Sequence, residues 1–137
     1  MNRKDLQGLA RIRLEESTAL LKLGLFDGAY YLAGYAVECA LKACIAKATK
    51  RGEFPDKRRV DSSHTHDMRE LVKLAGLEDV RRELAARDSA FRNYWDTIQS
   101  WSEHSRYRRH DLESAQKLVT AISDRRHGVF TWIKRHW

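Results

Sequence analysis

Apolar residues recur every three or four positions along most of the chain, and no segment alternates with the two-residue period of a β-strand. Only one proline and seven glycines interrupt the 137 residues, which favours long helices. We therefore expect an all-α fold in which residues 1–137 form a single domain. The expected architecture is an antiparallel four-helix, up-and-down bundle with an extra short helix. The helices are predicted over residues 4–23, 28–49, 67–76, 78–101 and 112–135.

Turn and capping residues mark the ends of these predicted helices. Gly24 is a typical C-terminal stop for the first helix, and Asp27 is expected to cap the second. Asp67 begins a capping-box pattern, and Asp111 is expected to cap the last helix. Between residues 50 and 65 the helical period stops, and a basic loop is predicted there.

The second predicted helix is apolar on almost every face, and one side carries only small residues. Such a helix lies at the centre of its bundle or in a dimer interface. Apolar residues also recur close to heptad spacing over 112–135. Together these features predict a symmetric homodimer that buries parts of both helices. The small residues are Ala29, Ala33, Ala36, Ala40 and Ala43.

Two cysteines, Cys39 and Cys44, fall on one predicted helix and point in different directions, so a disulfide between them is not expected. Buried free thiols suit a reducing cytosol. The start of the chain lacks the apolar core of a signal peptide, and we expect a cytoplasmic protein. No membrane span is predicted, because residues 29–48, the most apolar stretch, are interrupted by Glu38, Lys42 and Lys47.

The formal net charge is +7, which favours an anionic partner but also serves solubility. The densest group of cations is the sequence EHSRYRRHD at 103–111, between the last two predicted helices. Tyr107 stands among the arginines and is a candidate to contact a base, whereas other aromatic residues lie on a predicted core stripe. Candidate nucleic-acid contacts are therefore His104, Tyr107, Arg108 and Arg109.

Arg106 and His110 in the same group are the candidate catalytic pair. Histidine exchanges a proton near neutral pH, and arginine holds a phosphate through two parallel hydrogen bonds. His110 would activate a ribose 2′-hydroxyl and Arg106 would stabilise the phosphorane, so RNA cleavage would need neither metal nor cofactor. If the segment is helical, the two side chains share a face. The alternative is a solvated basic junction without chemistry.

Two further groups have alternative interpretations. Glu38 either pairs with Lys42 one helical turn away or faces the basic group and orients Arg106 or His110. The sequence His64-Thr65-His66-Asp67 offers metal-ligand side chains, but it lacks a nearby fourth ligand and is better explained as a helix start.

Three motifs in order resemble the HEPN domain of prokaryotes over most of the chain. They are YYLAGYAVECALKA at 30–43, THDMRELVKLAGL at 65–77, and Trp101 followed after four residues by Arg106-Tyr107. The resemblance implies a four- or five-helix up-and-down bundle that usually dimerises.

The resemblance also implies alternative functions. Many HEPN proteins are metal-independent endoribonucleases that act as toxins or in antiviral defence. Others are non-catalytic partners encoded beside a small nucleotidyltransferase, or are proposed nucleotide binders. Active members carry an arginine, four to six intervening residues and a histidine, and two such pairs meet in the dimer.

In this chain three residues separate Arg106 from His110, which favours the non-catalytic module somewhat. Three hypotheses follow: an RNA-cleaving dimer with an antitoxin, a module that binds RNA, a nucleotide or a nucleotidyltransferase partner, and a purely structural dimeric bundle.

Overall fold

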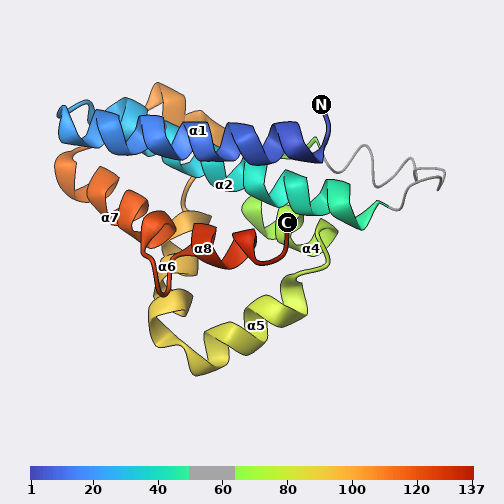
Figure 1. Cartoon of the computed structure of the whole chain (residues 1–137). Helices are drawn as coiled ribbons and strands as arrows, with labels where there is room; N and C mark the ends of the chain where they lie inside the picture. The colour runs from blue at the N-terminus through green and yellow to red at the C-terminus, as the bar shows by residue number, and fades with distance from the viewer. Residues whose placement is uncertain (50–63) are drawn as a thin grey trace.

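The computed structural model describes residues 1–49 and 64–137, and this part of the chain contains helices and no strands (Figure 1). The long helices α1 (Arg3–Lys22) and α2 (Phe26–Ala48) form an antiparallel pair, and α2 also contacts α4, η1, α7 and α8. The predicted all-α helical bundle is thus confirmed. The remaining elements are α4 (Met68–Leu74), α5 (Glu78–Arg87), α6 (Ser89–Gln99), the 3-10 helix η1 (Glu103–Tyr107), α7 (Leu112–Ser123) and α8 (Val129–Lys134).

Most predicted helix ends agree with the structure. Gly24 follows α1 with a φ of +79°, a left-handed conformation that glycine adopts without strain. Asp67 and Asp111 cap α4 and α7, accepting hydrogen bonds from the backbone N–H groups of Arg69 and Ser114. The prediction for Asp27 was wrong, because α2 begins at Phe26, so that Asp27 lies in its first turn, and the Asp27 side chain accepts a hydrogen bond from the N–H of His110.

The predicted helix over 78–101 is two helices. The chain is extended at Asp88, with a φ of −129° and a ψ of 96°, and the Asp88 side chain accepts a hydrogen bond from the N–H of Phe91. A residue cannot continue one helix and cap the next at the same time. Asp88 therefore ends α5 and starts α6.

The predicted helix over 112–135 is also interrupted. Asp124 leaves the helical conformation after α7, and its carboxylate accepts hydrogen bonds from the N–H groups of Arg126 and His127. A Cβ at Gly128 would lie 2.3 Å from the carbonyl oxygen of Asp124, so the turn requires glycine. The apolar spacing continues across this turn because both α7 and α8 face the core.

The small residues of α2 are covered within the single chain. Ala29, Ala33, Ala36, Ala40 and Ala43 are all completely buried. The predicted dimer interface on this side of α2 is therefore wrong, since these residues admit the neighbouring helices of the same chain instead. Their packing fixes α2 as the central helix, against which the candidate site is built.

Two other predictions concern the basic loop and a membrane span. The predicted basic loop lies almost wholly at residues 50–63, outside the described residues. In the described ranges, none of the helices combines the length and apolar character that a membrane crossing requires.

Candidate nucleic-acid interface

The segment between α6 and α7 is held against α2 at its start by Trp101. The indole of Trp101 is buried and lies over Gly34 of α2, so closely that a Cβ there would be 2.2 Å from the ring. η1 follows at once and also contacts α2. Two hydrogen bonds between Ser102 and Ser105 stabilise the start of η1. The Ser102 N–H donates to the Ser105 hydroxyl, and the Ser105 N–H donates to the Ser102 carbonyl.

The predicted contact residues are exposed along this segment, and we call residues 104–110 the basic segment. The side chains of His104, Arg106, Arg108 and Arg109 are all exposed, and Tyr107 is 76% exposed. The Arg106 guanidinium lies 4.9 Å from the centre of the Tyr107 ring. Hydrogen bonding and charge interaction with Tyr107, and then with Tyr31, raise the pKa of Arg106. Arg106 is a permanent cation on the surface.

Asp27 ties the end of the basic segment to the first turn of α2. One oxygen of its carboxylate accepts the backbone N–H of His110 at 2.5 Å, and the other lies 2.8 Å from Nε of Arg109. The Arg109 side chain is nevertheless 95% exposed, so this ion pair leaves most of its guanidinium accessible.

His110 is half-buried against α2, with its ring stacked on Tyr30. The ring centroids are 3.7 Å apart and the planes are inclined by 10°. His110 Nε2 lies 3.4 Å from the carbonyl oxygen of Ser105, a group that only accepts hydrogen bonds. This contact favours the tautomer with its proton on Nε2, which leaves Nδ1 as the proton acceptor.

Arg106 and His110 do not share a helical face. Arg106 belongs to η1, which ends at Tyr107, and the backbone is extended at Arg108, with a φ of −110° and a ψ of 154°. His110 lies beyond this extended stretch, directly before the cap of α7. The predicted relationship between the two side chains was therefore wrong, and the catalytic role of the pair stays a prediction.

Glu38 pairs with Lys42, as one prediction had it, and with His66, but with neither Arg106 nor His110. Its carboxylate is 2% exposed, and Oε1 lies 2.6 Å from Nδ1 of His66 while Oε2 lies 3.6 Å from Nζ of Lys42. The intrahelical pair with Lys42 is confirmed. The predicted orientation of Arg106 or His110 by Glu38 is wrong, because His66 occupies its other oxygen.

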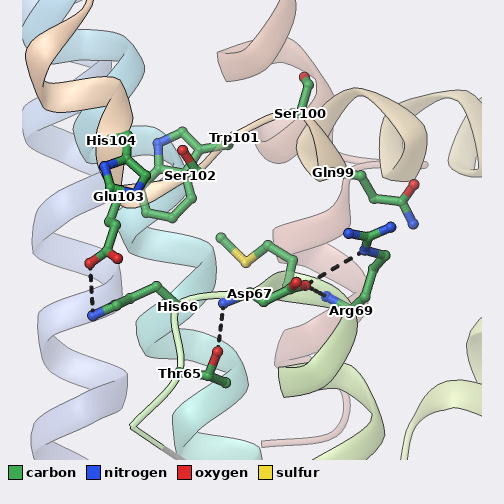
Figure 2. A pocket seen from close by; sticks show the side chains of 11 residues that line it. Thr65, His66, Asp67, Arg69, Gln99, Ser100, Trp101, Ser102, Glu103 and His104 are labelled. Atoms are coloured by element: carbon green, nitrogen blue, oxygen red, sulfur yellow. Dashed lines mark hydrogen bonds and ion pairs between the residues drawn. The ribbon is translucent and has the colours of Figure 1, made fainter.

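His66 links Glu38 to the beginning of η1. Its Nε2 lies 3.1 Å from Oε2 of Glu103, the first residue of that helix. Figure 2 shows the two side chains pointing toward each other. His66 and Glu103 border a cleft of about 310 Å³ between the start of α4 and η1, which His104 also lines. Within residues 1–49 and 64–137, no group of three side chains is placed to hold a metal ion.

Sequence reasoning missed three residues that shape this site. Asp27 was interpreted as a helix cap, Tyr30 as part of an apolar helix, and His66 as part of a helix start. Their partners lie between 28 and 83 positions away in the sequence. A single sequence carries no signal for such pairs, although the polar residues within an otherwise apolar α2 indicated a buried polar contact.

The fold and the site together define a class of protein, a helical bundle with an exposed cationic segment before its last helices. The family model of the HEPN domain matches residues 4–136, nearly the whole chain, and the protein therefore belongs to the HEPN family. Membership indicates a ribonuclease or nucleotide-related function in general. No curated protein and no solved structure matches the chain significantly.

Proposed function

We propose that this protein binds single-stranded RNA through the basic segment. The observation that carries the proposal is the exposure of Arg106, Tyr107 and Arg108 together. In the described part of the chain, neither arginine pairs with a carboxylate, so no ion pair has to break before either guanidinium binds phosphate. Tyr107 offers a ring on which an unpaired base stacks.

The arrangement of these side chains suits the binding of single-stranded RNA along a surface rather than of a small ligand in a closed pocket. The cations lie on an open surface, where they can contact the phosphates of a flexible strand, and the exposed ring of Tyr107 between Arg106 and Arg108 can stack on any base. Sequence-independent binding with a strong salt dependence is the expected behaviour. Membership in the HEPN family supports a nucleic-acid or nucleotide ligand in general.

Binding is tested by fluorescence anisotropy with a labelled single-stranded RNA at several salt concentrations. Replacing Arg106, Arg108 and Arg109 with alanine should weaken binding at least tenfold and reduce the logarithmic salt slope by about 0.7 for each phosphate that the protein no longer neutralises. The control replaces three exposed arginines near the α5–α6 and α7–α8 junctions, Arg87, Arg92 and Arg125, and removes the same charge. Equally weakened binding in both triple variants would contradict a localised site.

A second candidate function is metal-independent cleavage of the bound RNA, and the setting of His110 favours it. Nδ1 of His110 would accept the proton of a 2′-hydroxyl, whose oxygen attacks the adjacent phosphorus. The bond from phosphorus to the 5′-oxygen breaks, that oxygen takes up a proton from water, and the His110 imidazolium returns its proton to solvent. Arg106 would stabilise the charge on the phosphorane. The products are a 2′,3′-cyclic phosphate and a 5′-hydroxyl.

Cleavage is tested by incubating the protein with RNA in the presence of a chelator. Activity should persist there and should be abolished in Arg106→Ala and in His110→Ala, while both variants keep their helical circular dichroism. If both cleave as well as the parent, the pair is not catalytic. If the parent does not cleave at all, the protein acts as the non-catalytic alternative, a module that binds RNA, a nucleotide or a nucleotidyltransferase partner.

Assembly belongs to the same proposal. We propose a symmetric homodimer that brings two basic segments together, since this places Arg106 of one copy within reach of a strand bound by the other. The small residues of α2 do not provide the contact. An antitoxin would then bind over the paired basic segments. Light scattering that shows a monomer at tens of micromolar, roughly the concentration at which ordinary interfaces are filled, would contradict the dimer.

A further inference from the structure

His66 contacts a carboxylate with each of its ring nitrogens. Nδ1 is 2.6 Å from Glu38 on α2, and Nε2 is 3.1 Å from Glu103 on η1. A neutral imidazole carries a single N–H, so it can donate to only one of these two groups. The imidazolium donates to both. The geometry is therefore that of a protonated ring joining two elements that are distant in sequence.

The charges around His66 also suit the protonated form. Glu38 and Lys42 face it from α2, Glu103 and His104 from η1, and Asp67 and Arg69 belong to its own segment. Glu38 is almost fully buried, and a buried carboxylate must be compensated. Lys42 at 3.6 Å supplies one positive charge, and the imidazolium supplies a second for the two glutamates.

We propose that protonated His66 is a positioning residue that holds η1 against α2, so that RNA binding weakens when His66 loses its proton. The inference rests on the RNA-binding function proposed above. η1 has five residues and few hydrogen bonds of its own, so its position depends on its two ends. Glu103 holds one end through His66, and Asp27 holds the other through the His110 N–H. Arg106 lies between these two attachments.

The sign of a charge change separates positioning from simple electrostatics. Glu103→Ala removes a negative charge near the proposed phosphate site, so electrostatics alone predicts tighter RNA binding. Positioning predicts weaker binding, by about threefold to tenfold, because η1 is no longer attached at that end. The control is Glu113→Ala, which removes an exposed carboxylate from the first turn of α7 and should bind RNA as tightly as the parent or slightly more so.

The dependence on pH supplies the second measurement. The affinity for a labelled single-stranded polyuridine RNA is measured from about pH 5.5 to 8.5, the range in which histidine titrates, at constant ionic strength. The measurement is made with His104 and His110 both replaced by glutamine, because these two histidines belong to the basic segment. In that background binding should weaken as the pH rises, and adding His66→Gln should remove most of the change. The matched control is His127→Gln, because His127 is also 43% exposed and bonded to a carboxylate, but at the junction of α6 with the α7–α8 turn. It should keep the pH dependence of that background.

Amide exchange tests the attachment without RNA. The N–H groups of Ser105 and Arg108 are bonded within η1, and their exchange should be at least about tenfold faster in Glu103→Ala than in Glu113→Ala. Unchanged exchange together with tighter RNA binding in Glu103→Ala would overturn the inference. If the parent binds no RNA, the proposed function fails, whereas the attachment of η1 is still decided by the exchange rates.

Discussion

The imidazole of His110 lies flat on the phenol ring of Tyr30, with ring centroids 3.7 Å apart and planes inclined by 10°. Tyr30 is a buried residue of the central helix, and His110 is the last residue of the basic segment. The stack therefore fixes a partly exposed residue against the central helix of the bundle. It also sets the plane in which the ring can present Nδ1 to a ligand.

Replacing Tyr30 should separate the effect of the stack from that of the hydroxyl. Tyr30→Phe keeps the ring and should change the free energy of unfolding by less than about 1 kcal/mol, whereas Tyr30→Leu should lower it by about 1–3 kcal/mol, because the stack is removed and the packing is imperfect. Urea denaturation followed by circular dichroism measures both. Equal destabilisation of the two variants would show that the hydroxyl, and not the stack, stabilises this contact.

Acid should weaken the junction of α6 with the α7–α8 turn. The N–H of Phe91 and then His127 lower the pKa of Asp88, and the N–H groups of His127 and Arg126 lower the pKa of Asp124. A carboxyl whose pKa is lower in the folded state stabilises the fold above its unfolded pKa, near pH 4, and loses that contribution as the pH falls through the folded value.

The test measures the urea midpoint as a function of pH. Asp88→Asn retains a side chain that can cap α6 but cannot ionise, so its stability should fall less steeply in acid than that of the parent. Asp79→Asn removes an exposed carboxylate from the first turn of α5 and serves as the control. If the urea midpoints of the parent and of Asp88→Asn fall equally steeply as the pH is lowered, this carboxylate does not have the proposed role.

The two cysteines should be unreactive in the folded protein. Burial raises the pKa of both Cys39 and Cys44 to about 11, so little thiolate exists near neutral pH. At about pH 8 a disulfide reagent should modify them only slowly, and denaturant should make both react at once. Rapid modification of the native protein would show that α2 opens locally and would contradict its central position.

The residues that were predicted well are those whose role depends on near neighbours in the sequence. Gly24, Asp67 and Asp111 end or cap helices through contacts within a few residues, and the sequence pattern shows such contacts directly. The breaks at Asp88 and Asp124 were missed because the apolar period continues across them. The two helices that flank each break face the same core. Apolar periodicity therefore shows which residues are buried, but not whether the helix is continuous.

The candidate site was predicted only in part, for a related reason. The exposed cations of the basic segment are adjacent in the sequence and were found as a charge cluster. Glu38 was recognised as a carboxylate that needs a partner, but one of its two partners, His66, is 28 positions away. The contact between them depends on how α4 and η1 pack against α2, and a tertiary contact of this kind leaves no local pattern.

Gly34 should tolerate substitution poorly, because the indole of Trp101 lies directly over it. A Cβ there would lie 2.2 Å from Cε2 and 2.3 Å from Cδ2 of Trp101, so the indole would have to move. Alanine gains about 1 kcal/mol over glycine in helix propensity, but overpacking against a buried ring costs about 1–3 kcal/mol. Because Trp101 directly precedes the basic segment, its displacement should also shift η1. We expect Gly34→Ala to be destabilised and to bind RNA several-fold more weakly.

The control for Gly34 lies in α1. A Cβ at Gly8 would meet no atom within 4 Å, so Gly8→Ala should be as stable as the parent or more stable by up to about 1 kcal/mol. Relief of the clash offers a further test, since the smaller ring of Trp101→Phe makes room for the added methyl group. Stability measured by urea denaturation should then be non-additive, with the double variant more stable than the sum of the two single changes predicts. Strictly additive changes in stability would show that Gly34 and Trp101 act independently. In that case the contact with Trp101 is not the reason why glycine is needed at position 34.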